Sequence, residues 1–201
     1  MPNPALRAAA VCLLLLLGLA VQVPAQSGGS TAQADLDQLV QTAQNIVRGQ
    51  VVSARIEPHP QFPNLKTVLI TVSVSKVLKG TAGPTLTFRQ FVWDAREGSA
   101  LAAYKGAGEM ILFLNPVSQY GLTSPVGLEQ GRFRVMRDEK GGRFVVNGRG
   151  NFGLFNQVSE KAAERGVTLS KPTLQMLAGA TGKASLEAFE QAVQSLAGAS
   201  K

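Results

Sequence analysis

An alternation of apolar and polar side chains in the middle of the chain limits its fold more than any other feature. Over residues 68–75, Val68, Ile70, Val72 and Val74 alternate with Leu69, Thr71, Ser73 and Ser75. Successive side chains of a β-strand point to opposite faces, so this pattern predicts a long strand with one buried face and a mostly solvated one. The chain therefore needs a sheet with an apolar interior.

Other segments rich in β-branched and aromatic residues predict further strands. They are residues 46–56, 85–89, 109–114, 132–136 and 143–146. Segment 109–114 is apolar throughout its second half, which predicts a central strand covered on both faces. Phe91 and Trp93 have the opposite parity to Phe88. We expect a bulge near Arg89 and Gln90 to return both rings to the core; the alternative is that both are exposed.

Helices are predicted at the two ends of this strand region. Asp35 is a candidate N-cap for a short helix that reaches Ala43, and a second short helix follows Val158 and is closed by Gly166. Ser185 is a candidate cap for a last helix. Its apolar stripe recurs at intervals of three and four residues: Leu186, Phe189, Val193 and Leu196. Such a stripe packs on its own domain or, in fewer proteins, on a partner.

The N-terminal residues have the pattern of a secretory signal peptide. Arg7 precedes an uninterrupted apolar run, residues 8–21, and Val23 and Ala25 supply the small side chains that a signal peptidase reads before cleavage. The alternative, an uncleaved membrane anchor, needs about 20 apolar residues, more than this run contains. We expect cleavage after Ala25 and an exported protein, either periplasmic or secreted.

These observations predict four parts. They are a signal peptide at 1–25, a flexible leader at 26–34, a β-barrel domain at 35–156 and a helical C-terminal tail at 157–201. The expected fold class is mainly β, with five or six strands in a small barrel, a short N-terminal helix and C-terminal helices.

Cysteine content and charge bound the chemistry further. The only cysteine, Cys12, leaves with the signal peptide, so the mature chain has neither a disulfide nor a thiolate. The full chain carries a net charge of +7, and loss of Arg7 leaves +6 (19 minus 13). A positive balance favours anionic partners, but it is also common on exported proteins that bind none.

The sequence offers few residues for catalysis or metal binding. His59 is the only histidine, and it lies between Pro58 and Pro60 in a loop where we expect it at the surface. Without a second histidine, a zinc or copper cluster is not expected. Ser73 and Lys76 point to opposite faces of a strand, so they do not form a nucleophile and base. The sequence predicts no catalytic residue, no metal site and no cofactor.

Basic and aromatic residues share two strands, which indicates a binding surface. Arg89 accompanies Phe91 and Trp93, while Arg132 and Arg134 flank Phe133, a ring that we expect in the core. Aromatic platforms beside cations are used by proteins that bind single-stranded nucleic acid. The candidate binding residues are Arg89, Trp93, Arg132 and Arg134.

The strand region resembles the opening of netrin-like modules, the class that includes the tissue inhibitors of metalloproteinases. The resemblance rests on residues 46–53, the strand from Val68 to Val74, the turn at 76–80, residues 86–88 and the apolar strand 110–114. It implies a five-stranded OB-type barrel with a helix packed against it. Those inhibitors present a disulfide-tied N-terminal cysteine to the zinc of the protease. This mature chain has no cysteine, so that mechanism is not implied. Residues 120–135 also resemble a segment of uncharacterised bacterial exported proteins.

These expectations lead to three functional hypotheses. The first is a non-enzymatic exported β-barrel that binds a protein partner in the periplasm or the medium. The alternative is a binder of an anionic polymer, either single-stranded nucleic acid or an acidic polysaccharide, through Arg89, Arg132 and Arg134. The third is a hydrolase whose acid and base converge only in the folded chain.

Overall fold

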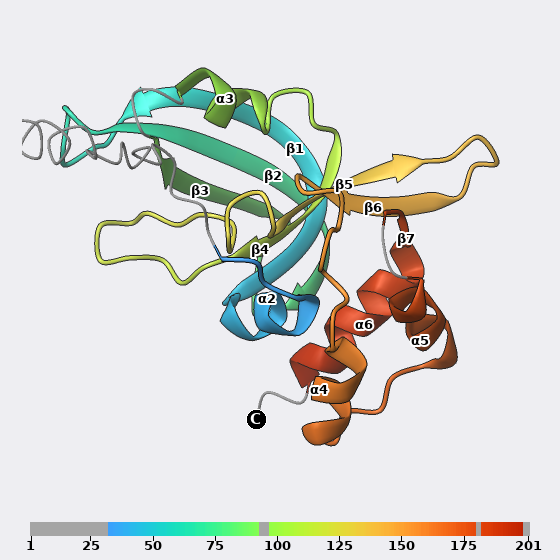
Figure 1. Cartoon of the computed structure of the whole chain (residues 1–201). Helices are drawn as coiled ribbons and strands as arrows, with labels where there is room; N and C mark the ends of the chain where they lie inside the picture. Colours follow the sequence, from blue (N-terminus) through green and yellow to red (C-terminus); the bar gives the residue numbers. More distant parts are fainter. Residues whose placement is uncertain (1–31, 93–96, 180–181, 199–201) are drawn as a thin grey trace, which may run out of the picture. The chain divides into compact units, whose positions relative to one another are not determined.

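The computed structural model describes residues 32–92, 97–179 and 182–198, and within these ranges the strands form one antiparallel sheet (Figure 1). The expected signal peptide, Trp93 and most of the expected leader lie outside the described residues. The strands are β1 Asn45–Pro58, β2 Lys66–Lys79, β3 Thr85–Phe91, β4 Glu109–Leu114, β5 Arg132–Arg137, β6 Arg143–Asn147 and β7 Ala184–Ser185. Their order across the sheet is β3-β2-β1-β4-β5-β6-β7.

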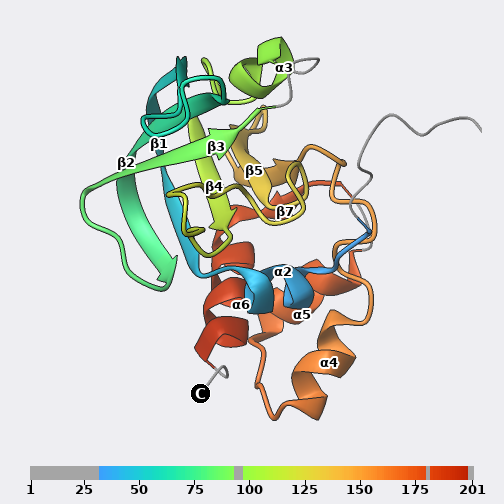
Figure 2. The same ribbon diagram turned by 90° about the vertical axis from the view of Figure 1, so that its left-hand side faces the viewer.

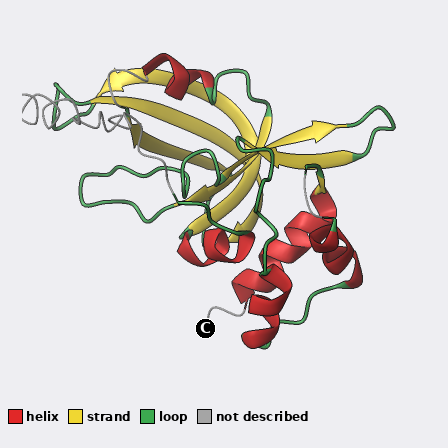
Figure 3. Ribbon diagram, viewed as in Figure 1, coloured by secondary structure: helices red, strands yellow, loops and turns green. Residues whose placement is uncertain are grey.

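Five helices accompany the sheet in the described ranges. They are α2 Leu36–Thr42, α3 Glu97–Ala102, α4 Val158–Glu164, α5 Lys171–Ala178 and α6 Leu186–Gly198. Figure 2 shows α2, α4, α5 and α6 grouped on one side of the sheet and α3 at the other, and Figure 3 separates helices from strands by colour. The fold is therefore mixed α/β, and the predicted mainly β class is wrong. None of these helices combines the length and hydropathy of a membrane-spanning helix.

The predicted closed barrel, and the OB-type barrel that the resemblance implied, are also wrong, because β3 and β7 are the two edges of an open sheet. Strand β5 pairs with β4 only over Met110–Leu112 and then continues into a hairpin with β6. Figure 1 shows this hairpin projecting away from β3. Within the described ranges, β2 is the only strand that pairs with β3. Loop 115–131 meets β3 at an isolated bridge between Arg89 and Leu122.

The predicted alternation along β2 is confirmed, and it supplies one of two apolar clusters. Val68, Ile70 and Val72 are fully buried and pack with Phe88 on the face that α3 covers. The second cluster lies on the opposite face, where the stripe of α6 packs against the sheet. Rings from three elements meet there: Phe189 of α6 lies 4.8 Å from Phe133 and 6.2 Å from Phe113, between ring centroids. The last helix therefore docks on its own sheet.

Strand β4 contributes to both clusters. Met110 and Leu112 belong to the cluster beside β2, whereas Ile111 and Phe113 belong to the helical cluster, and all four side chains are fully buried. This confirms the prediction of a central strand covered on both faces.

The long β1–β2 hairpin carries the irregularities of the sheet. Its pairing shifts register between Ile46 and Val47, between Arg48 and Gly49, and between Val51 and Ser53. Such bulges increase twist and allow a strand to bend. The pairing of β2 with β3 is regular through Arg89 and Gln90, so the bulge predicted there is wrong. Gln90 takes the buried position, Phe91 is half-buried, and Trp93 lies outside the described residues.

Asp35 is the N-cap of helix α2, as predicted. The Asp35 carboxylate accepts from the Gln38 amide N–H, and the Gln38 side chain accepts from the Asp35 N–H, so a capping box is complete. Lys161 forms an ion pair with Asp35, and Arg165 forms one with Asp37. These two contacts fix α4 against α2.

The end of the expected leader contacts the folded chain. Gln130 donates to the Ala32 carbonyl at 2.9 Å and accepts from the Ala34 N–H at 2.8 Å, and the Gln33 amide donates to the Phe152 carbonyl at 2.9 Å. Residues 32–34 thus add to the structure beside loop 115–131.

Candidate binding groove

A groove of about 640 Å³ lies between two loops at the end of the sheet where β1 turns into β2. One loop, residues 59–65, joins β1 to β2, and the other is loop 115–131, which follows β4 (Figure 1). The lining side chains are all uncharged: Gln61, Phe62, Pro63, Asn64, Leu65, Tyr120 and Leu122. A concave and mostly apolar surface of this size is typical of a ligand or side-chain site.

His59 joins the two loops. Its Nε2 lies 2.8 Å from the Tyr120 carbonyl oxygen, and its Nδ1 lies 3.2 Å from the Gln61 amide nitrogen. Because the Gln61 N–H donates, Nδ1 must be the acceptor, and Nε2 therefore carries the hydrogen that it donates to Tyr120. The side chain is only 4% exposed. The prediction of a surface histidine is wrong, because partners distant in sequence cover the ring.

Aromatic stacking holds two exposed rings above His59. The rings of Phe62 and His59 stack with centroids 5.1 Å apart, and Tyr120 meets Phe62 edge to face at 5.6 Å. Phe62 nevertheless remains 43% exposed and Tyr120 50% exposed. Large apolar surface that is both ordered and solvated is the kind that a partner covers with a gain in free energy.

Arg89 joins β3 to the neighbouring strands and to the second loop at this end of the sheet. Its guanidinium lies 2.6 Å from the Glu57 carboxylate and donates to the Thr67 hydroxyl at 2.8 Å, and its side chain is 14% exposed. Hydrogen bonds from Arg89, and then from Arg55, hold the pKa of Glu57 below its ordinary value. The Arg89 carbonyl accepts from the N–H of Thr123, in the second loop. Arg89 thus positions the groove and does not present a free cation.

The other predicted binding residues lie elsewhere. Arg132 and Arg134 are on β5, separated from β3 by three strands, and line a hollow of about 280 Å³ together with Glu129, Met136, Val146, Asn147 and Gly148. The Arg132 guanidinium stacks 5.2 Å from the Tyr104 ring centroid, and Arg134 is exposed. Burial raises the pKa of Tyr104 to about 12, although Arg132 acts in the opposite direction. The structure does not bring Arg89 together with the β5 arginines, and Trp93 lies outside the described residues.

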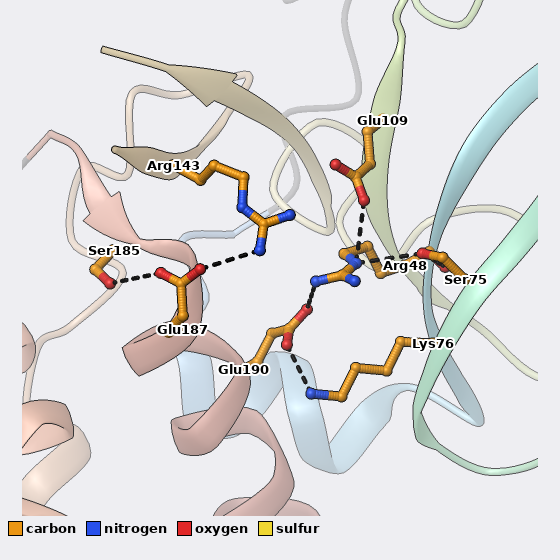
Figure 4. A network of polar contacts seen from close by, with 8 residues as sticks. All are labelled: Arg48, Ser75, Lys76, Glu109, Arg143, Ser185, Glu187 and Glu190. Carbon is orange, nitrogen blue, oxygen red and sulfur yellow. Dashed lines mark hydrogen bonds and ion pairs between the residues drawn. The ribbon is translucent and has the colours of Figure 1, made fainter. Parts of the chain in front are cut away.

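Several acidic side chains are held in ion pairs between elements. Glu190 of α6 lies 2.6 Å from Arg48 and 2.7 Å from Lys76, and Arg48 also contacts Glu109 at 3.1 Å (Figure 4). Within ranges 32–92, 97–179 and 182–198, no three histidine, cysteine or acidic residues converge in a way that suits a metal ion. The ion pairs of Figure 4 instead join helix α6 to strands β1 and β2.

The sequence did not single out the residues that form the groove. Phe62 lies in a loop with three prolines, which indicated only a connection, and Tyr120 is distant in sequence. No local pattern relates two loops that meet only after the sheet has formed. No family model, curated protein or solved structure matches this chain. The role of the groove is therefore argued from its own chemistry.

Proposed function

We propose that this chain is an exported, non-enzymatic binding module, and that the groove receives an uncharged apolar segment of a polypeptide partner. The observation that carries the proposal is the pair of half-exposed rings, Phe62 and Tyr120, held in order by His59 at the rim of an uncharged groove. The groove carries no charge on a chain of net charge +7, so its complement is an apolar, uncharged segment.

The hydrogen bonds and ion pairs of the polar side chains favour binding over catalysis. Both ring nitrogens of His59 are used by backbone groups, which leaves neither to accept a proton from a substrate. Glu57 and Glu190 are each held by two basic side chains. Side chains held in such contacts stabilise the fold.

The same contacts weigh against an anionic polymer as the partner. Arg89 is neutralised by Glu57, and Arg132 lies over the Tyr104 ring. Arg134 is exposed, but it lines the smaller hollow together with Glu129 and lies away from the groove. The positive charge is therefore not concentrated at the groove.

Site-specific photo-crosslinking tests the proposal. A photoreactive phenylalanine analogue is placed at Phe62 in the producing cells, and covalent adducts are identified by mass spectrometry. The matched control is the same analogue at Phe152, which is 69% exposed and outside the groove. We expect a discrete polypeptide adduct from position 62 and none from position 152.

The identified partner then allows a quantitative test. Phe62→Ser should weaken binding at least about tenfold, because an aromatic anchor in a groove contributes more than about 1.4 kcal/mol. Phe152→Ser should leave the affinity unchanged, and circular dichroism should show that both variants remain folded. Absence of a position-62 adduct, or equal effects of the two substitutions, would contradict the proposal. Affinity that falls steeply with salt would favour an anionic polymer.

A further inference from the structure

The contact between His59 and Tyr120 has a consequence for how the groove is controlled. His59 is the only histidine of the chain, and it is buried between the two loops that form the groove. Its Nε2–H donates to a carbonyl of one loop while Nδ1 accepts from an amide of its own loop. Both contacts require a neutral ring with its hydrogen on Nε2.

Protonation is incompatible with this arrangement. A cationic imidazole carries hydrogen on both nitrogens, so Nδ1 would face the Gln61 N–H as one donor against another. The stack on Phe62 and the low exposure of the ring leave little room to rearrange while the loops stay together. The charged ring must then reach water, which requires the two loops to separate.

The charges around the loops do not compensate for a cation. Loops 59–65 and 116–122 contain no charged residue, and their only other titratable group is the Tyr120 phenol. The strands at their base contribute one carboxylate, Glu57, which Arg89 and Arg55 already engage. A positive charge on His59 would therefore gain no uncommitted carboxylate from these two loops or from Glu57.

From these contacts we infer that His59 is a proton-sensitive latch. When the ring is neutral it holds the two loops together and keeps the groove formed, and when it is protonated the loops separate and the groove is lost. The inference rests on the proposed function only for its biological use, since the latch is a property of the groove itself. Histidine is the side chain that ordinarily changes charge between about pH 5 and pH 8. A partner held at neutral pH is thus released on acidification, because the closed form binds one proton fewer.

The first test needs no ligand. Because the chain has one histidine, its imidazole signals in nitrogen-detected NMR spectra are unambiguous. We expect the Nε2–H tautomer at neutral pH. As the ring gains a proton, the amide signals of Gln61 and Tyr120 should shift with the same midpoint. An Nδ1–H tautomer, or loop amides that do not follow the ring, would overturn the inference.

The second test measures the groove with N-phenyl-1-naphthylamine, an uncharged fluorescent probe of apolar sites. Its affinity should fall by roughly tenfold between pH 7.5 and pH 5, a coupling of ordinary size. His59→Gln keeps a side-chain amide for Tyr120 but cannot be protonated, so its affinity should not change with pH. An equal pH response in parent and variant would overturn the latch.

The two proposals fail in distinguishable ways. If position 62 yields no polypeptide adduct while the probe and the amide signals follow His59, the latch stands and the proposed function does not. If an adduct forms but neither readout depends on the ring, the reverse holds. Should His59→Gln not fold, the NMR measurement on the parent chain still decides.

Discussion

The ion pairs that join α6 to the sheet give a sharp prediction about stability. Glu190 is 6% exposed, and its two carboxylate oxygens are used by Arg48 at 2.6 Å and Lys76 at 2.7 Å. Glu190→Gln removes the charge and leaves a single acceptor for two cations. Hydrogen bonds to charged groups contribute about 1.5–3 kcal/mol each, so we expect a loss of about 3 kcal/mol in the free energy of unfolding. In a chain of this size, the melting temperature should then fall by about 6–12 °C.

The matched control lies on the same helix. Glu187 pairs with Arg143 at 3.1 Å, but both side chains are substantially exposed, so Glu187→Gln should cost less than about 1 kcal/mol. Thermal and urea unfolding of the two variants, followed by circular dichroism, measure the difference. A double-mutant cycle of Glu190→Gln with Lys76→Met should give a coupling energy above about 0.5 kcal/mol. Equal losses from the two glutamine variants would refute the assignment of stability to the buried network.

Further predictions concern pH and packing. Arg89 lowers the pKa of Glu57 in the folded chain. The contribution of Glu57 to stability is therefore complete above its unfolded-state pKa and is lost as the pH falls through the lower folded-state value. Glu57→Gln should remove this loss from acid unfolding curves. Burial raises the pKa of Tyr104 from 10.0 to about 12. The stability that the neutral phenol contributes is therefore complete below pH 10 and is lost as the pH rises to about 12. Phenolate absorbance of the parent and of Tyr104→Phe will measure this titration. A Cβ at Gly49 would lie 2.3 Å from a β2 carbonyl oxygen, so Gly49→Ala should cost about 1–3 kcal/mol in urea unfolding, whereas Gly98→Ala, with nothing within 4 Å, should cost none.

Much of the local structure was predictable because it depends on short-range periodicity. The alternation at Val68, Ile70 and Val72, the unbroken apolar run of β4 and the cap at Asp35 each specify an element through neighbouring residues. Helices α3 and α5 and the short β7 were not predicted. Strand β7 has only two residues, too few to show a strand pattern, and pairs with β6 immediately before α6 begins.

The arrangement of these elements was not predictable in the same way. A barrel closes only if a strand distant in sequence pairs with β3. The alternation of apolar and polar residues along each strand is the same in a closed barrel and in an open sheet. His59 and Arg89 show the same limit for side chains. Flanking prolines suggested exposure for His59, and the aromatic residues Phe91 and Trp93 on the same strand suggested binding for Arg89. The Tyr120 carbonyl and the Glu57 carboxylate, which contact these two side chains, reach them only in the folded chain.

The double covering of β4 determines how the chain loses its structure. Met110 and Ile111 are consecutive residues, yet each is anchored in a different apolar cluster. Water that enters from either side reaches the same central backbone hydrogen bonds, so we expect the two clusters to unfold together. We therefore expect a substitution that destabilises the helical face also to destabilise the hairpin that carries the groove.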